Sequence, residues 1–573
     1  MSRMFHLIAL FAALLACAGS LRAVEEQSAD STFVIGGILT QVGDVIPPWS
    51  EEAHDSNRIL QFGYRLTNAL HIATRKHVVE RELLFKVGDT LDTLSLQETA
   101  RNLRAYPFIN EAEVTPYTDE SGATIVHVRT SDNFSIAPGI IFEGGGGGTT
   151  YGAILTETNL FGLGKRVAGQ YIRETGTVNT TTWAFEYKDH RVFGSRWFFH
   201  LYAEDLATGS QIATVMEYPF YRLSSQNASG WSLDFNDSYR RMYGTTSSRV
   251  GDIVAEIPRR YIGGNAWYSY RWGDDYRRTK LTSAIAWYDY SYSGLPRTIV
   301  DTHYTITQAD TTRTPRRGYQ LTASIGREAF TGFLTSRFLD DFLVVEDVDT
   351  GWEFGATGGV GIPEKPTREL YGITGVYGSY ANVFGASGDH IVAAEATGVV
   401  HLADDHGLGR RTWSNLVTDA WVHWYWQGLP IQTIATSLNW YAGWRMYDPF
   451  QITLGGDTGL RGYATNQFAG NRRLLLNVED RIFPGWRIFT VAIGLVGFAD
   501  AGYVWKADER LNPADLHANV GFGLRVGNTR ASTSRISRLD FAFALRGEKR
   551  IMLAFGSEQV FDLFNIRPTP TRD

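Results

Sequence analysis

The longer part of the chain, from residue 133 to residue 564, repeats one short pattern in which apolar and polar side chains alternate. Residues 183–188, 517–526 and 539–546 are clear examples. Successive side chains of a β-strand point to opposite faces, so each run predicts a strand with one apolar and one polar face. No long polar or proline-rich linker divides this part of the chain, and it therefore predicts one large sheet.

The distribution of side chains favours a transmembrane β-barrel over a soluble β-sandwich. The chain has 28 Tyr, 32 Phe, 16 Trp and 59 Gly. The aromatic residues crowd the ends of the alternating runs, while the polar faces hold Gly, Ala and paired charges. A barrel in lipid has a wet lumen and aromatic girdles at both interfaces. The mean hydropathy of −0.19 is compatible with this fold, because only alternate side chains face lipid.

The first residues, 1–23, have the pattern of a secretory signal peptide. The apolar core at 7–16 is too short to span a bilayer. We expect cleavage after Ala18 or near Ala23, and lipid attachment to Cys17 is the second interpretation. Cys17 is the only cysteine, so the exported protein must be stable without disulfides. A formal net charge of −7 argues against a nucleic-acid partner.

Residues 24–132 predict a small α+β domain. The expected order is a strand at 33–42, helices at 74–85 and 94–103, and strands at 109–117 and 123–130. Thr74 is expected to cap the first helix, which carries Val78, Val79, Leu83 and Leu84 on one face. Glu98, Arg101 and Arg104 are expected on the outer face of the second helix. His71 and His77 lack Cys or carboxylate support and are interpreted as surface groups, not metal ligands.

This order of elements resembles a POTRA domain, the periplasmic module of the BamA and TamA superfamily, also called the bacterial surface antigen family. The residues that carry the resemblance are Asn68, Leu70, His71, Thr74, Arg81, Glu82, Leu83, Leu84, Gly88, Asp89, Arg101, Leu103 and Arg104. A second match is the Asn- and Gly-containing turn at 159–165, which is similar to the turn after the second barrel strand of that superfamily. The resemblance implies an edge strand in the POTRA-like domain that can capture an extended peptide.

Residues 454–463 are the most distinctive stretch of the barrel part. They contain four glycines and one cation, Arg461, which predicts a tightly turned backbone that carries a single fixed charge. A surface turn with a solvated arginine is the alternative. In the superfamily, a similar motif joins the eleventh strand to the twelfth of a sixteen-stranded barrel. Five strands are therefore expected after it, and we predict them at 471–482, 487–504, 517–526, 538–546 and 551–561.

Strand parity supplies candidate partners for Arg461. Leu474, Leu476, Val478 and Ile482 are expected to face lipid, as are Phe489, Val491, Ile493 and Leu495 on the next strand. Glu479 and Asp500 have the opposite parity and point into the lumen. A guanidinium can bind both carboxylates with charge-assisted hydrogen bonds. We therefore predict a structural latch that consists of Arg461, Gly462, Tyr463, Glu479 and Asp500, with no catalytic role, cofactor or metal.

The resemblance implies an outer-membrane protein with its POTRA-like domain in the periplasm at 24–132, its barrel at 133–564 and a tail at 565–573. Members of the superfamily insert or translocate other proteins. The seam strands would be 134–142 and 551–561, where exported client polypeptides pair by strand addition. The glycines at 144–148 either loosen that seam or form a turn.

The remaining implied partners are outer-membrane lipid and a periplasmic partner of the POTRA-like domain. A single such domain favours a specialised relative over the general assembly machine. Two other functions remain open: a passive pore or receptor, and a hydrolase embedded in the barrel. No spacing of Ser, His and Asp selects a catalytic set, so we expect no enzyme.

Overall fold

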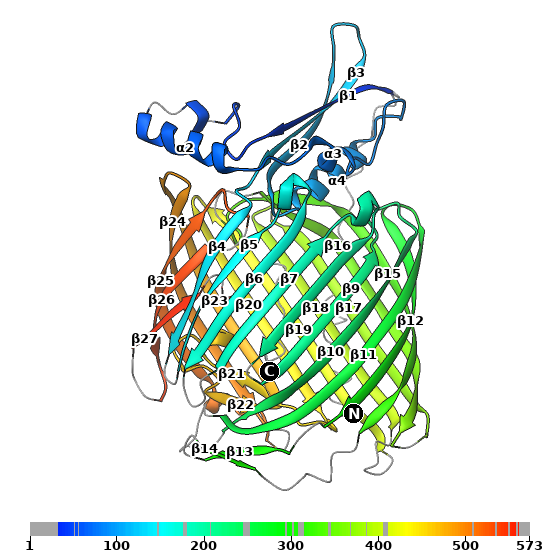
Figure 1. Cartoon of the computed structure of the whole chain (residues 1–573), viewed down its shortest axis with the longest axis vertical. Coiled ribbons are helices and arrows are strands. Elements are labelled where there is room, and N and C mark those ends of the chain that lie inside the picture. The colour runs from blue at the N-terminus through cyan, green and yellow to red at the C-terminus, as the bar shows by residue number, and fades with distance from the viewer. Residues whose placement is uncertain are drawn as a thin grey trace.

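The computed structural model describes residues 33–560, apart from residues 51, 55–56, 146–147, 176–179, 207, 245–252, 293–294, 301–302, 307–314, 342–344, 367, 386, 405–410, 507–508, 533–535, 548–550 and 557–559. The predicted signal peptide at 1–23, with Cys17, and the tail at 565–573 lie outside the described residues. The chain forms a small N-terminal domain that sits on one rim of a large barrel (Figure 1). We call this the near rim and the opposite one the far rim.

The N-terminal domain is a three-stranded sheet with helices. Its elements are β1 (Ile35–Gly43), the short turn η1 (Glu52–His54), α2 (Arg58–Leu70), α3 (Lys76–Glu80), α4 (Thr93–Arg104), β2 (Ile109–Thr118) and β3 (Thr124–Asp132). The strand order is β1-β3-β2, in which β1 is parallel to β3 and β2 is antiparallel to it. The core includes Ile35, Val78, Leu103, Phe108 and Val126. None of the described helices is long and apolar enough to cross a membrane.

Several details of this domain differ from the prediction. The helix expected at 74–85 spans only Lys76–Glu80. It begins after Arg75, and the Thr74 side chain binds Asp132 and does not cap the helix. Glu98, expected on the outer face of α4, is buried, because it accepts a hydrogen bond from the Leu223 backbone in the barrel. The helix α2 was not predicted. By contrast, α4 begins close to the expected position, after the N-cap residue Asp92.

Twenty strands circle the barrel in the described part of the chain. They are β4 (Ile136–Gly145), β5 (Gly148–Glu157), β6 (Lys165–Thr175), β7 (Thr180–Asp189), β8 (Phe198–Leu206), β9 (Gly209–Tyr218), β10 (Asn227–Tyr243), β11 (Ile253–Gly273), β12 (Arg277–Ser291), β15 (Arg316–Ser336), β16 (Glu346–Lys365), β17 (Tyr371–Phe384), β18 (His390–Asp404), β19 (Arg411–Leu429), β20 (Gln432–Trp444), β23 (Arg472–Ile488), β24 (Val491–Trp505), β25 (His517–Asn528), β26 (Ile536–Ala544) and β27 (Ile551–Gly556). The short strands β13 (Arg297–Val300) and β14 (His303–Ile306) extend the sheet beside β11.

The expected count of sixteen strands is therefore wrong. The strands β4 to β9 are shorter and are joined by short turns, so that six of them lie between residues 136 and 218. The five strands expected after the glycine-rich stretch are all present as β23 to β27, although the last one, predicted at 551–561, is described only as Ile551–Gly556.

The side-chain parity of β23 and β24 agrees with the prediction at all but one position. Arg473, Asn477, Glu479 and Arg481 are buried on the lumen side, and Leu476 and Leu495 lie exposed on the outward face. Phe489, expected on the outward face, is the exception. It lies in the turn between the two strands with a φ of 58°, and its ring stacks on Tyr64 of the N-terminal domain.

The connection between β20 and β23 leaves the far rim and folds into the barrel. It contains β21 (Ile452–Leu454), the turn η4 (Gly456–Thr458) and β22 (Phe468–Gly470), and β21 pairs with β22 (Figure 1). Leu454, Leu460 and Tyr463 pack on Leu475 of β23 and Ala544 of β26. We call residues 445–471 the lumen loop. Its own small apolar core holds it against the barrel wall.

Candidate functional site: a buried charge cluster in the lumen

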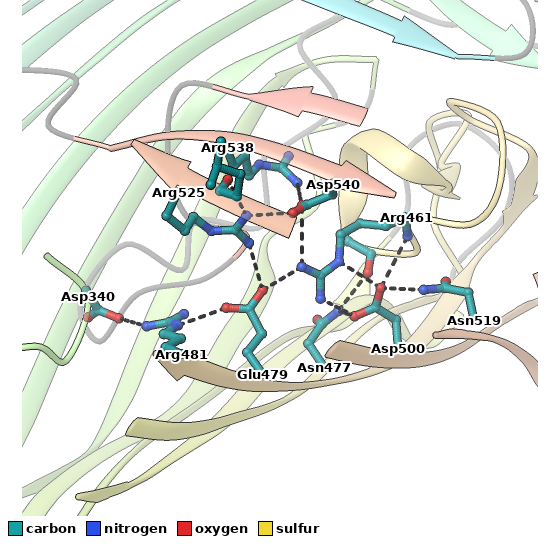
Figure 2. Close-up of polar contacts among 12 residues, drawn as sticks. Asp340, Arg461, Asn477, Glu479, Arg481, Asp500, Asn519, Arg525, Arg538 and Asp540 are labelled. Atoms are coloured by element: carbon teal, nitrogen blue, oxygen red, sulfur yellow. Dashed lines mark hydrogen bonds and ion pairs between the residues drawn. The ribbon is translucent and has the colours of Figure 1, made fainter. Parts of the chain in front are cut away.

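The lumen loop places Arg461 between three barrel strands (Figure 2). Nη1 donates to Oε1 of Glu479 on β23 at 2.6 Å. Nε and Nη2 donate to the two carboxylate oxygens of Asp500 on β24, at 2.9 and 2.7 Å. Nη1 also lies 3.5 Å from Asp540 on β26. The structure thus brings together the three charged residues that the sequence had selected, and adds a fourth.

Neighbouring groups fix the guanidinium and its partners in place. The ring of Phe498 lies 3.5 Å from Cζ of Arg461, which is close enough for planar stacking. Asn477 and Asn519 each donate to one oxygen of Asp500 at 2.7 Å. Phe498, Asn477 and Asn519 all come from the barrel wall, so the loop arginine meets an acceptor that the wall itself holds in place.

Gly462 and Tyr463, the other loop residues predicted for the latch, position Arg461. A Cβ at Gly462 would lie 2.5 Å from Cβ of Asn519, so only glycine permits this approach of the loop to β25. The Tyr463 hydroxyl lies 3.1 Å from the carbonyl oxygen of Ala518 and 3.0 Å from that of Arg546. Its ring is buried at the base of the loop.

The cluster is larger than sequence reasoning predicted. Arg525 on β25 donates to Asp540 at 2.6 Å and lies 3.5 Å from Glu479. Arg538 on β26 donates to the other oxygen of Asp540 at 3.1 Å. Arg525 and Asp540 lie on the polar faces of the predicted strands 517–526 and 538–546, but strand parity alone does not assign them to the latch. The pairing register of β25 and β26 indicates this contact. Gly523 faces Asp540 and Arg525 faces Arg538, so Arg525 and Asp540 are diagonal neighbours on the same face of the sheet.

A further arginine connects the cluster to the near rim. Arg481 donates to the second oxygen of Glu479 at 2.8 Å, and to the side chain of Asp340 and the carbonyl oxygen of Leu339 at 2.6 Å each. Residues 339 and 340 belong to the connection between β15 and β16 at the near rim. A line of ion pairs therefore runs from the far-rim loop through Glu479 to a near-rim turn (Figure 2).

The carboxylates of this cluster are fully paired and buried. Both oxygens of Glu479, Asp500 and Asp540 have a cationic or amide partner. Arg461, Glu479 and Asp500 are at most 1% exposed. No carboxylate oxygen is left open toward a substrate, and, within the described residues, no group of three or more His, Cys, Asp or Glu side chains is placed to hold a metal ion.

Comparisons with known proteins give matches at the level of structure. BamA from Haemophilus ducreyi lacking POTRA domains 1–3 is 13% identical, with 92% of this chain and 84% of that chain covered and a TM-score of 0.32. The chain is similar to BamA and CdiB. CdiB from Acinetobacter baumannii is 10% identical over 91% of this chain and 73% of that one, with a TM-score of 0.42. CdiB from Escherichia coli is 10% identical over 94% and 92%, with a TM-score of 0.35.

Neither the protein-family models nor the curated proteins contain a match to this sequence. Because the structural matches have low identities and low TM-scores, the function of this chain is inferred from its own contacts.

A second polar network joins the N-terminal domain to the near rim. Asp132 at the end of β3 accepts hydrogen bonds from the backbone and hydroxyl of Thr74, at 2.7 and 2.9 Å, and lies 2.9 Å from Nε2 of His71. Asn159, in the turn between β5 and β6, donates to the Thr74 hydroxyl at 2.8 Å. The His71 side chain is thus buried, contrary to its interpretation as a surface group, whereas His77 is exposed.

Glu82 forms the second attachment to the near rim. It is fully buried, and Arg191 in the turn between β7 and β8 donates to both of its oxygens, while Arg196 donates at 3.2 Å. On the opposite side, Arg104 and Arg101 of α4 bind Asp347 and Asp349 of β16. Many of the residues that carry the POTRA resemblance are therefore those that attach this domain to the barrel.

Proposed function

We propose that this chain is an outer-membrane protein of the BamA and TamA type, which inserts or translocates exported polypeptides without enzymatic chemistry. In this account residues 1–23 direct export, the N-terminal domain is a single POTRA-like module in the periplasm, and the barrel spans the outer membrane. The near rim then faces the periplasm. The observation that carries the proposal is the junction between the first and last barrel strands.

Within the described residues, this junction is one of the two shortest in the barrel wall. β27 has six residues and is the shortest of the described barrel strands, and it lies beside the ten-residue β4. The six described residues of β27 limit the backbone hydrogen bonds that it can form with β4, as they limit its pairing with β26, so separating β27 from β4 costs less than separating two long strands. A client strand that pairs with the freed edge replaces the lost hydrogen bonds.

The start of β4 is held without help from β27. The Phe134 backbone N–H donates to the carbonyl oxygen of Arg530 at 2.7 Å, and Ser532 donates to Phe134 at 3.3 Å and, through its hydroxyl, to Ser135 at 3.2 Å. These contacts lie in the turn between β25 and β26. When β4 and β27 separate, β4 therefore stays anchored at the near rim and keeps its edge in position.

The charge cluster and the N-terminal domain fit this role better than that of a passive pore. The lumen loop occupies the barrel interior, where the Arg461 latch holds it. The N-terminal domain is attached at the near rim. The C-terminal end of its edge strand β2, Thr115–Thr118, is exposed, so an extended client can pair with it. We assign Arg461, Gly462, Tyr463, Glu479 and Asp500 to the latch and none of them to catalysis.

Depletion of the protein in its native host, followed by quantitative proteomics of the outer membrane, tests the function. We expect selective loss of other exported proteins, restored by the wild-type chain.

Locking the seam with a disulfide provides the sharper comparison. A cysteine at one of residues 138–142 is combined with a cysteine at one of residues 551–555, in a Cys17→Ser background.

The pair that forms a disulfide should fail to restore the lost proteins until a reductant is added. The matched control locks Ile325→Cys to Ala356→Cys, which face each other on β15 and β16 away from the seam, and it should restore function fully. An unchanged outer-membrane proteome on depletion, together with a large steady conductance, would instead establish a passive pore. Full rescue by the seam-locked chain would contradict lateral opening.

A further inference from the structure

The helix α2 carries an apolar face that no other part of the described chain covers. Ile59, Phe62, Leu66 and Leu70 are 80%, 64%, 47% and 61% exposed. At 100° per residue these four side chains and Ala69 share one arc of the helix surface, with Arg58 and Arg65 along one edge of the arc. An apolar stripe bordered by basic residues is typical of a helix that lies in a membrane interface.

The opposite face of α2 is bound firmly to the protein, so the helix has a defined orientation. Asn57 caps its N-terminus through the backbone N–H groups of Ile59 and Leu60. The Asn68 side chain accepts from the Ile46 backbone N–H at 3.0 Å and donates to the Ile46 carbonyl oxygen at 2.8 Å. Tyr64 is buried and stacks on Phe489, with ring centroids 4.9 Å apart.

These contacts place α2 where the outward apolar surface of the barrel ends. Phe489 follows β23, whose last residues include Trp486 and Ile488, which are 57% and 73% exposed. Glu52, just before α2, binds Arg487 at 3.0 Å and Arg530 at 3.2 Å at the same rim. In Figure 1 α2 lies over the barrel rim near the start of β24, roughly perpendicular to the barrel axis.

We propose that α2 is an interfacial anchor that inserts its apolar face into the membrane leaflet at the near rim, with Arg58 and Arg65 beside the lipid phosphates. This rests on the proposed membrane location of the barrel. The face continues the outward surface of β23, and its flanking charges are basic although the whole chain is acidic. Both features select an anionic lipid surface over an acidic or basic protein groove. The anchor holds the N-terminal domain close to the strands that precede the seam.

Depth-dependent quenching tests the insertion. A bimane label is attached to Phe62→Cys in a Cys17→Ser background, and the full chain is reconstituted into vesicles of phosphatidylethanolamine and phosphatidylglycerol. We expect strong quenching by brominated lipids and several-fold protection from iodide. A label at Tyr117→Cys, an exposed position on β2 away from the rim, should show the reverse. A label at Ile325→Cys on the outward face of β15 reports whether the barrel itself is in lipid.

The outcomes separate the two proposals. If Ile325→Cys is quenched by lipid while Phe62→Cys is as open to iodide as Tyr117→Cys, the barrel is in the membrane and the anchor is wrong. If neither Ile325→Cys nor Phe62→Cys is quenched, the proposed membrane location fails as well. If Phe62→Cys is open to iodide in vesicles but shielded in native membranes, a protein partner covers α2, which also overturns the lipid anchor.

Discussion

Arg461 binds carboxylates from three strands at once, which a lysine cannot do, because an ammonium group lacks the fixed planar fork of donors. We predict that Arg461→Ala lowers the free energy of unfolding by about 3–5 kcal/mol, because it leaves Glu479, Asp500 and Asp540 buried without their shared cation. Arg461→Lys should retain only part of the stability. Urea unfolding in detergent, followed by tryptophan fluorescence, measures both changes.

The matched control is Arg510→Ala, an exposed arginine in the far-rim connection between β24 and β25, which should change stability by less than about 0.5 kcal/mol. Neutralising the partners as well, with Arg461→Met, Glu479→Gln and Asp500→Asn together, should cost less than Arg461→Ala alone. If Arg461→Ala and Arg510→Ala unfold at the same urea concentration, the cluster does not hold the loop.

We predict that His190 makes the attachment of the N-terminal domain sensitive to acid. Its ring packs against Tyr106, with centroids 5.1 Å apart. Burial, together with Arg191 and Lys188, lowers the pKa of His190 to about 4. The detached state takes up a proton near the ordinary pKa of about 6.5, so the contact keeps its full strength above that pH and weakens as the pH falls from there toward 4.

We therefore expect the opening free energy of the turn between β7 and β8, measured by hydrogen exchange, to fall by about 1–2 kcal/mol between pH 7 and pH 5. His190→Phe should remove most of this dependence, whereas His77→Phe, at an exposed position, should leave it unchanged. An equal pH dependence in the wild type and His190→Phe would exclude His190 as its origin.

Parity along single strands was sufficient to select Glu479 and Asp500 as inward-facing partners of Arg461. It was not sufficient for Asp540, Arg525 or Asn519, because their approach to the loop depends on the register between β25 and β26 and on how deeply the loop enters. The same limit applies to His71. Its partner Asp132 lies at the end of a strand distant in sequence, and only tertiary packing brings the two together.

At the scale of elements, α3 and the segment after it attach the N-terminal domain to two turns of the barrel. The Glu82 carboxylate pairs with both Arg191 and Arg196, and Glu82→Gln removes its negative charge. We predict that it weakens this attachment by about 3 kcal/mol, because two partly buried arginines lose their counter-charge. Hydrogen exchange in residues 76–82 and 189–198 should become faster by about 100-fold.

Glu80→Gln is the control for this change. Glu80 is exposed and pairs only across one helical turn with Lys76 in the described structure, a contact worth about 0.3–0.5 kcal/mol. Faster exchange in Glu80→Gln to the same degree as in Glu82→Gln would show that the domain is attached by other contacts.

Elements with strong periodicity could be predicted, which explains the success with β23 to β27 and α4, whereas the predicted cap Thr74 was wrong. The short hairpins from β4 to β9 carry no signal that separates one long strand from two, so the strand count was wrong. The helix α2 was missed because most of its large apolar residues, Ile59, Phe62, Leu66 and Leu70, are exposed and only Tyr64 is buried. These residues form an exposed apolar face, and a search for buried core residues does not detect such a helix.

At the scale of the whole molecule, three attachments surround the proposed seam. The lumen loop is latched near the middle of β23, the N-terminal domain is fixed to several near-rim turns, and the start of β4 is held by the turn at residues 530–532. Among the described residues, β27 is short, so its pairing with β4 is short, as is its pairing with β26. The proposed function predicts that client polypeptides contact the barrel at this junction and nowhere else along its wall.

Site-specific photo-crosslinking in living cells tests this claim most directly. A photoreactive amino acid replaces Ile140, an exposed residue on β4, or Ile325 on the outward face of β15. The account predicts that Ile140 forms adducts with exported outer-membrane proteins, and that the Arg461–Glu479 latch and folded barrel are retained in both variants. Ile325 should form none. Adducts that are absent at Ile140, or equally abundant at Ile325, would contradict insertion through the seam.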